Sequence, residues 1–174
     1  MAELSFRPLT WDDLPLLHEW LHRPHVLRWW KEGFTLAEVE AHYGPSLEGD
    51  DPTYHYLALV DGRPAGFFQT YLYGDYPEAA AMSLDQGAAG VDLFVADEDA
   101  TGRGLGTELL RRFVDEYAFA LPGATHCIAE PEEANRASIR AFEKAGFHVV
   151  RGWDNPEDGK RHVIVRKDRS RPLS

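Results

Sequence analysis

The chain has 174 residues, a formal net charge of −11 and 44% hydrophobic residues, which is typical of one globular domain with its own core. So acidic a surface repels nucleic-acid phosphates and favours cationic small molecules, although acidity alone can simply serve solubility. No apolar run is long enough to span a bilayer, and no leader segment is expected. The single cysteine, Cys127, excludes an internal disulfide and predicts a reducing, cytoplasmic location.

The first part of the chain predicts one strand followed by two helices. Residues 3–9 alternate between apolar and polar side chains, as strands do. Thr10 starts the first helix with a capping box, and Pro24 is expected to end it. A second capping box starts the next helix at Thr35, which is expected to stop at the Gly-Pro pair that ends with Pro45.

A hairpin and a long loop are expected next. The strands at 54–60 and 64–73 are joined through Asp61-Gly62, a dipeptide that favours tight hairpin turns. Residues 74–90 then predict a long loop, and loops of that length in compact domains are often functional.

The second half of the chain alternates strands with helices. The expected segments are a strand (90–96), a glycine-rich turn (101–108), a helix (105–117), a strand (124–130), a helix (135–147) and two strands (147–153 and 161–167). Strand–helix–strand order implies a right-handed crossover, so we expect one parallel pair in an otherwise antiparallel sheet. We predict a single domain over residues 1–168 and a tail at 169–174.

The glycine-rich turn predicts an anion site. Gly102, Gly104 and Gly106 alternate where a strand leads into a helix. Glycines let backbone N–H groups approach an anion, and a helix N-terminus adds a favourable dipole. Arg103 can add positive charge, whereas the Lys-Ser/Thr pair of a P-loop does not follow. The turn is therefore interpreted as a pyrophosphate cradle built from backbone.

Two segments together resemble the core motifs of the GNAT acetyltransferase superfamily. They are the strand and turn at 90–108 and the sequence N-x-x-S-I-x-x-F-E-K-A-G-F that starts at Asn135. The resemblance implies acetyl-CoA as the acetyl donor and an α/β (α+β) GNAT fold. Such a fold has a mixed, mostly antiparallel sheet of about six to seven strands, with a parallel central pair flanked by helices.

The same resemblance assigns the coenzyme A contacts. They are Leu93, Phe94, Val95, Gly102, Arg103, Gly104, Leu105, Gly106, Thr107, Asn135 and Phe142. Two positions depart from the family pattern. Thr101 stands where many members carry Gln or Arg, and Phe142 stands where many carry a tyrosine that reprotonates the leaving thiolate. Core packing is the favoured interpretation of Phe142.

A finer resemblance points to the aminoglycoside 6′-N-acetyltransferases. It rests, in order, on LLHEWLHRPHVLRWW, TLAEVEAHYGPS, GFFQTYLY, GVDLF, AEPEEAN and EDGKRHVIV. It implies direct acetyl transfer to the 6′-amine of an aminoglycoside in a ternary complex, with Asp92 as the catalytic carboxylate. The acceptor contacts that it implies are Trp30, Tyr43, Asp75, Asp92, Glu130 and Asp158. Glu130 stands where the family has Asp.

Physical chemistry agrees with this acceptor. Aminoglycosides are sugar polycations, which carboxylates hold by charge-assisted hydrogen bonds. Asp92, with a reference pKa of about 3.9, can orient the ammonium and accept its proton directly or through water. Backbone N–H groups at 93–95 can polarise the thioester carbonyl.

Several alternatives remain open from the sequence. A siderophore-type lysine N-acyltransferase shares the LHEWLHRPHV segment, but such enzymes tend to carry His in place of Asp92. A peptide N-acetyltransferase and a non-catalytic acyl-CoA-binding module are also compatible. Residues 18–22 (HEWLH) fit the zinc-protease pattern H-E-x-x-H, although so short a motif is frequent by chance and further ligands are missing. We therefore expect no metal, nucleic acid or membrane partner, and a monomer or homodimer.

Overall fold

The computed structural model describes residues 1–76, 87–100 and 103–170. The chain divides into two compact units, unit 1 (Met1–Gln69 and Leu93–Gly106) and unit 2 (Thr70–Asp92 and Thr107–Ser174). The predicted extent of the domain, 1–168, stays a prediction. Within the described ranges, no helix is both long and apolar enough to cross a membrane.

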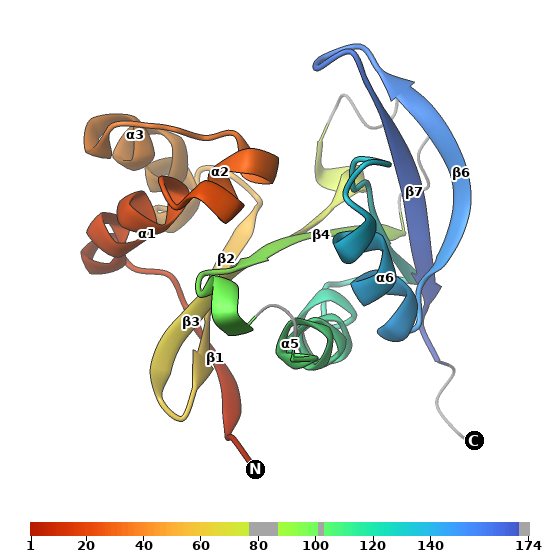
Figure 1. The fold of residues 1–174 in the computed structure, drawn as a ribbon, viewed down its shortest axis with the longest axis horizontal. Coiled ribbons are helices and arrows are strands. Elements are labelled where there is room, and N and C mark those ends of the chain that lie inside the picture. The colour runs from red at the N-terminus through yellow and green to blue at the C-terminus, as the bar shows by residue number, and fades with distance from the viewer. Residues whose placement is uncertain (77–86, 101–102, 171–174) are drawn as a thin grey trace. The chain divides into compact units, whose positions relative to one another are not determined.

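The described strands form one mixed sheet. They are β1 (Leu4–Pro8), β2 (Tyr54–Val60), β3 (Arg63–Leu72), β4 (Ala88–Val95), β5 (His126–Ala129), β6 (His148–Asn155) and β7 (Lys160–Asp168) (Figure 1). Their order in the sheet is β1-β2-β3-β4-β5-β7-β6. β4 pairs with β5 in parallel, whereas β1 with β2, β5 with β7 and β6 with β7 are antiparallel. The predicted mixed sheet with a parallel central pair is confirmed.

Unit 1 packs three helices beside its strands. They are α1 (Leu14–Leu21), α2 (Pro24–Trp30) and α3 (Leu36–Leu47), preceded by the 3₁₀ turn η1 (Trp11–Asp13). Their apolar faces meet side chains of β2 and β3 in one buried cluster, whose members include Leu14, Leu17, Leu21, Val26, Val39, Tyr43, Leu57 and Phe67. The amphipathic pattern that predicted α1 and α3 is the pattern that builds this core, whereas α2 is a helix that the sequence analysis did not predict.

Two helix boundaries differ from the prediction, and both involve proline. α1 already stops at Leu21, and Pro24 begins α2 instead of ending the first helix. Proline suits the first turn because the N–H that it lacks has no partner there anyway. Pro45 lies inside α3, which continues to Leu47. Pro45 lacks the N–H that would bond four residues back, so α3 loses that one backbone hydrogen bond and ends within one turn of the proline.

The remaining 3₁₀ turns are η2 (Tyr73–Asp75) and η3 (Glu98–Ala100). The loop predicted at 74–90 is shorter than expected at its far end, because Ala88–Gly90 already pair with β5 as part of β4. Residues 77–86 of that predicted loop lie outside the described residues.

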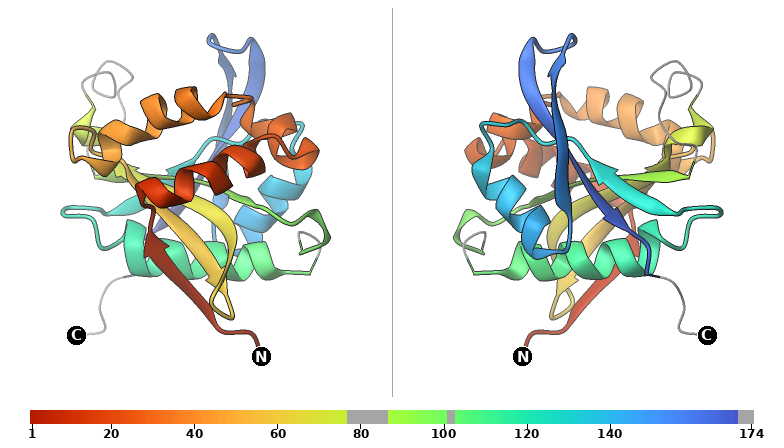
Figure 2. Two further views of the ribbon diagram at one scale, coloured as in Figure 1. Left: turned by 90° about the vertical axis from the view of Figure 1, so that its left-hand side faces the viewer. Right: turned by 90° about the vertical axis from the view of Figure 1, so that its right-hand side faces the viewer.

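Unit 2 contains most of α5 (Leu105–Phe113), the π-helical turn η4 (Val114–Ala118) and α6 (Arg136–Lys144). The antiparallel strands β6 and β7 run side by side up to their connecting turn in every view (Figures 1 and 2). Cys127 is fully buried in β5, as expected for a small core residue.

Gly66 in β3 is required by the close approach of β4. A Cβ at this position would lie 2.7 Å from the Phe94 carbonyl oxygen, which is a steric clash with backbone. We expect Gly66→Ala to lower the free energy of unfolding by about 1–3 kcal/mol in urea titrations. Gly33→Ala is the control, because its Cβ would meet only a Leu27 methyl at 3.5 Å. Equal stability of the two variants would contradict this account.

His55 makes unit 1 sensitive to acid. The ring is buried against Phe67 at a centroid distance of 5.6 Å, and burial lowers its pKa from 6.5 to about 4. Between these values the unfolded chain binds a proton that the folded chain does not, so stability falls as pH falls, by up to ~1.4 kcal/mol per pH unit. His55→Phe should flatten this slope between pH 6.5 and 4 in urea titrations. An unchanged slope would assign the acid sensitivity to other groups.

Candidate active site

The carboxylates expected at the acceptor belong to unit 2, and strand register explains their position. β4 and β5 pair in parallel with Gly90 opposite Ile128. Two residues further along the chain in each case are Asp92, which is in β4, and Glu130, which directly follows β5, so the two acidic side chains leave the same end of the parallel pair. Burial, and after it the charge of Asp92, raises the pKa of Glu130. The two carboxyl groups are therefore close enough to interact.

Two tyrosines lie within electrostatic reach of these carboxylates. The rings of Tyr71 and Tyr73 are 5.3 Å apart and their hydroxyls share a hydrogen bond. Burial raises the pKa of both, and the charges of Asp92 and Glu130 raise it further, so both hydroxyls keep their protons at neutral pH. The sequence analysis did not single them out, although both are in the GFFQTYLY segment.

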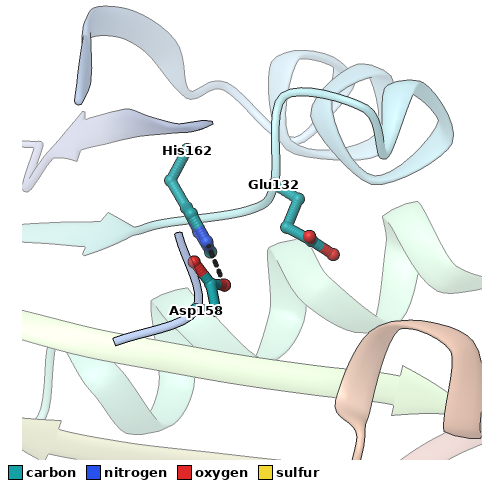
Figure 3. Close-up of side chains that lie close together, drawn as sticks. All are labelled: Glu132, Asp158 and His162. Carbon is teal, nitrogen blue, oxygen red and sulfur yellow. Dashed lines mark hydrogen bonds and ion pairs between the residues drawn. The ribbon is translucent and has the colours of Figure 1, made fainter. Parts of the chain in front are cut away.

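Asp158, in the turn between β6 and β7, has a histidine partner that sequence reasoning also missed. His162 Nε2 is 2.7 Å from the Asp158 carboxylate (Figure 3). His162 Nδ1 is 2.9 Å from the backbone carbonyl oxygen of Glu130. The side chain of His162 is 12% exposed and that of Asp158 is 27% exposed. One histidine thus connects the turn that carries Asp158 with the end of β5.

Glu132 completes a local cluster. Among the described residues, Glu132, Asp158 and His162 are the one trio of His, Cys, Asp and Glu side chains whose ligand atoms all lie within 4.8 Å. Lys160 Nζ is 3.2 Å from Glu132 Oε1, so a cation of the chain itself already balances this carboxylate. We interpret the trio as an ion-pair cluster.

The zinc-protease segment at 18–22 contributes nothing to that trio. The imidazole rings of His18 and His22 lie 4.6 Å apart, and His22 Nδ1 is 2.8 Å from the His18 carbonyl oxygen. His22 therefore has a local backbone partner at the end of α1.

In unit 1, the end of β4 is held by side chains from the start of α2. Arg23 donates to the Ala96 carbonyl oxygen at 2.6 Å, and His25 Nε2 is 3.0 Å from the Val95 carbonyl oxygen. The backbone N–H of Ala96 donates in turn to the carbonyl oxygen of Ala65 in β3 at 2.9 Å. The backbone at 93–95, where contacts with the acetyl donor are predicted, is thus anchored from both sides. Only the Arg-Pro-His sequence in LHRPHV could have signalled these two residues.

The glycine-rich turn has the open backbone that an anion cradle needs. Gly104 adopts a φ of +76° and a Cβ there would meet nothing within 4 Å, so the backbone faces free space. Leu105 and Gly106 then begin α5, with Thr107 in its first turn, and Arg103 beside them is exposed. These residues fit a pyrophosphate group. Gly102, and Thr101 before it, lie outside the described residues.

The predicted acceptor contacts of unit 1 have packing partners. Tyr43 is 1% exposed, and its hydroxyl donates to Glu32 at 2.6 Å. Trp30 contacts the rings of Phe67 and Phe94 edge-on, at centroid distances of 5.7 and 5.1 Å. Contact of Tyr43 and Trp30 with an acceptor stays a prediction.

The other predicted contacts are in unit 2. Asp75 is exposed in η2, and Asn135 caps α6 by accepting a hydrogen bond from the Ser138 N–H at 3.3 Å. Phe142 is buried, with its ring 5.0 Å from that of Phe147, which agrees with the packing interpretation. The roles of Asn135 and Phe142 toward coenzyme A stay predictions.

Comparison with known proteins identifies the family. Residues 10–155 match the family model of the acetyltransferase (GNAT) domain. The chain is 36% identical to aminoglycoside N(6′)-acetyltransferase type 1 of Klebsiella pneumoniae, over 94% of this chain and 82% of that protein. It is 30% identical to the lysine N-acyltransferase MbtK of Mycobacterium tuberculosis, over 77% of this chain and 63% of that protein.

The fold leads to the same family. The crystal structure of aminoglycoside acetyltransferase AAC(6′)-Ib with coenzyme A and kanamycin matches with a TM-score of 0.86 and 33% identity, over 96% of this chain and 95% of that one. The family match includes residues 18–22, so the HEWLH segment is part of an acetyltransferase domain. The chain therefore belongs to the GNAT acetyltransferase family, as an acetyl-CoA-dependent enzyme similar to the aminoglycoside 6′-N-acetyltransferases.

Proposed function

We propose that this enzyme transfers the acetyl group of acetyl-CoA to the 6′-amine of an aminoglycoside. The observation that carries the proposal is the acidic group in unit 2, in which Asp92, Glu130 and Asp158 are linked by strand register and by His162. Several carboxylates at one place repel each other unless a cation binds, and a polycationic sugar supplies the matching ammonium groups. The Klebsiella relative and the kanamycin complex of AAC(6′)-Ib support the same acceptor class.

Asp92 is the proposed base. Acetyl transfer needs a neutral amine, and deprotonating an ammonium of pKa about 8 at pH 7 costs only about 1.4 kcal/mol, so a strong base is unnecessary. Acetyl-CoA supplies an activated acyl group as a thioester. The Asp92 carboxylate orients the ammonium and takes its proton, and the adjacent backbone N–H groups at 93–95 polarise the acyl carbonyl.

Glu130 and Asp158 bind the acceptor in this proposal. Glu130 is half-buried and its pKa is raised by burial and by Asp92, so part of its charge is lost as pH falls toward the acid range. A bound ammonium would favour the charged carboxylate and offset this effect. Asp158 is more exposed than its partner His162, which suits a contact made at the rim of the site.

A cytoplasmic location and a role in aminoglycoside resistance are part of the proposal. The unpaired, buried Cys127 supports a reducing compartment. The resistance role follows from the acceptor class, because acetylation removes a positive charge from the drug.

The test of the function is coenzyme A release with a panel of acceptors. Kanamycin and tobramycin are expected to be acetylated at the 6′-amine, as mass spectrometry and NMR of the product would show. Lysine derivatives and N-terminal peptides complete the panel. Acetylation of a lysine derivative with no turnover of any aminoglycoside would favour the lysine N-acyltransferase alternative, to which the similarity with MbtK points.

Asp92→Asn tests the base. The change is nearly isosteric, so affinity for acetyl-CoA should remain while kcat falls by roughly 10²–10⁴, the contribution of a positioned base. Asp154→Asn is the control, since this carboxylate is exposed in β6 and pairs with Arg161. Steady-state kinetics with kanamycin and calorimetry with coenzyme A give both quantities. Wild-type turnover in Asp92→Asn would remove Asp92 from the catalytic role.

Gly104→Val tests the pyrophosphate cradle. A β-branched side chain would occupy the free space beside the turn, so coenzyme A affinity should fall at least about ten-fold in calorimetry. The positive φ also adds about 1–2 kcal/mol of backbone strain. Gly49→Val is the matched control, because Gly49 has a φ of +84° and open space around it. Equal coenzyme A affinity in the two variants would place the cradle elsewhere.

A further inference from the structure

His162 makes two hydrogen bonds that bear on its protonation state. A carbonyl oxygen can only accept, so the contact with the Glu130 carbonyl at 2.9 Å requires a hydrogen on Nδ1. A neutral imidazole would then present a bare Nε2 to the Asp158 carboxylate, and two acceptors 2.7 Å apart repel each other. With the Asp158 carboxylate ionised, this geometry places a proton on Nε2 as well, so that His162 is an imidazolium paired with Asp158 (Figure 3).

The charged groups around the ring support this state. Burial alone would lower the pKa of His162, but the hydrogen bonds to Glu130 and Asp158 and the charges of Asp158 and Glu132 raise it overall. Glu132 faces His162 across a backbone bridge between their two segments, and Lys160 Nζ pairs with Glu132 Oε1 at 3.2 Å.

The other groups near the ring come from β6, from the start of β7 and from the turn between them. From β6 the ring meets Trp153, which is uncharged, at a centroid distance of 6.0 Å. The neighbouring Arg161 is paired with Glu133 and Asp154, each at 3.3 Å. The acidic Glu157 precedes Asp158 in the turn. The backbone N–H of Glu157 donates to Asn155 Oδ1 at 2.9 Å.

We propose that His162 is the internal counter-ion of Asp158 and a specificity-determining residue for the acceptor. This rests on the proposed function, in which Asp158 binds an ammonium group of the aminoglycoside. When the ammonium arrives, it replaces the His162 N–H at the carboxylate. The Nε2–H bond breaks, the proton passes to solvent, and Asp158 exchanges one cationic partner for another.

The exchange predicts how acceptor binding depends on pH. While His162 is protonated, the pair is neutral and attracts a polycation weakly. Once His162 loses its proton, the pair carries one negative charge and attracts the same polycation more strongly. Acceptor affinity should therefore rise as pH increases through the titration of His162, and this rise should depend on the imidazole.

The first experiment compares His162→Gln with the wild type. Glutamine can still donate a hydrogen bond to Asp158 but cannot carry charge. The KM of the His162→Gln variant for kanamycin should therefore lack the rise at low pH that depends on His162. The ratio of wild-type KM to variant KM should change by roughly three- to ten-fold between pH 8.5 and 5.5. Titration of the drug's own amines is common to both proteins and cancels in the ratio. His148→Gln, an exposed histidine on β6, should behave like the wild type. A ratio that does not vary with pH would overturn the proposal.

The second experiment measures the proton itself. Kanamycin binding is followed by calorimetry in two buffers of different ionisation enthalpy, with coenzyme A at saturation. Near the titration midpoint the wild type should release more protons than either His162→Gln or Asp158→Asn. Equal proton release in all three proteins would contradict the exchange. If a variant fails to fold, NMR titration of wild-type His162 replaces it, and kanamycin should shift the midpoint to lower pH.

The two proposals can fail separately. If the wild type neither binds nor acetylates any aminoglycoside, the proposed function is wrong. The ion pair is then judged in the protein without acceptor, where Asp158→Asn should lower the NMR titration midpoint of His162. An unchanged midpoint would show that His162 is not the counter-ion of Asp158.

Discussion

The parallel pairing of β4 with β5 is the constraint on which the proposed site depends. The pairing joins Ala88–Gly90 to His126–Ile128 and then stops, so both strands continue past it without a shared ladder. Parallel strands present equivalent ends at one edge of a sheet, which explains why Asp92 and Glu130 leave the pair together. A one-residue slip in this register would turn each side chain to the opposite face.

Concentrating acidic groups at that edge has an electrostatic cost. Burial and the charge of Asp92 raise the pKa of Glu130, so ionising Glu130 costs more free energy at this position than in water. The chain offsets part of the cost with cations of its own, Lys160 beside Glu132 and His162 beside Asp158. These two pairs offset carboxylate charge in the protein without a bound acceptor. In the proposed function, a polycationic ligand replaces the internal cation at Asp158, the more exposed member of its pair.

Rigidity at the end of β4 comes from side chains in unit 1. Arg23 and His25 bind the carbonyl groups of Ala96 and Val95, and Gly66 lets the neighbouring backbone come close. Backbone N–H groups can polarise an acyl carbonyl only if they are held in position before the reaction. The buried aromatic rings of this unit, including Tyr43, fill the core against which α2 packs, and both anchors lie at the start of that helix.

The sequence by itself determined the order of the described strands, the helices α1, α3, α5 and α6, the Asp61-Gly62 hairpin and the glycine turn, because each depends on local periodicity or on a short motif. The role of Asp92 came from the family resemblance and stays a prediction. It did not determine that Pro24 begins a helix, that Tyr43 is buried, or that His162 binds Asp158. Proline is compatible with a helix start as well as a helix end, and burial depends on which face packs against a core. His162 and Glu130 are 32 residues apart in the chain, and only the strand pairing of β5 with β7 brings them together. Sheet register is a tertiary property, so the chemistry that depends on it was decided by the fold.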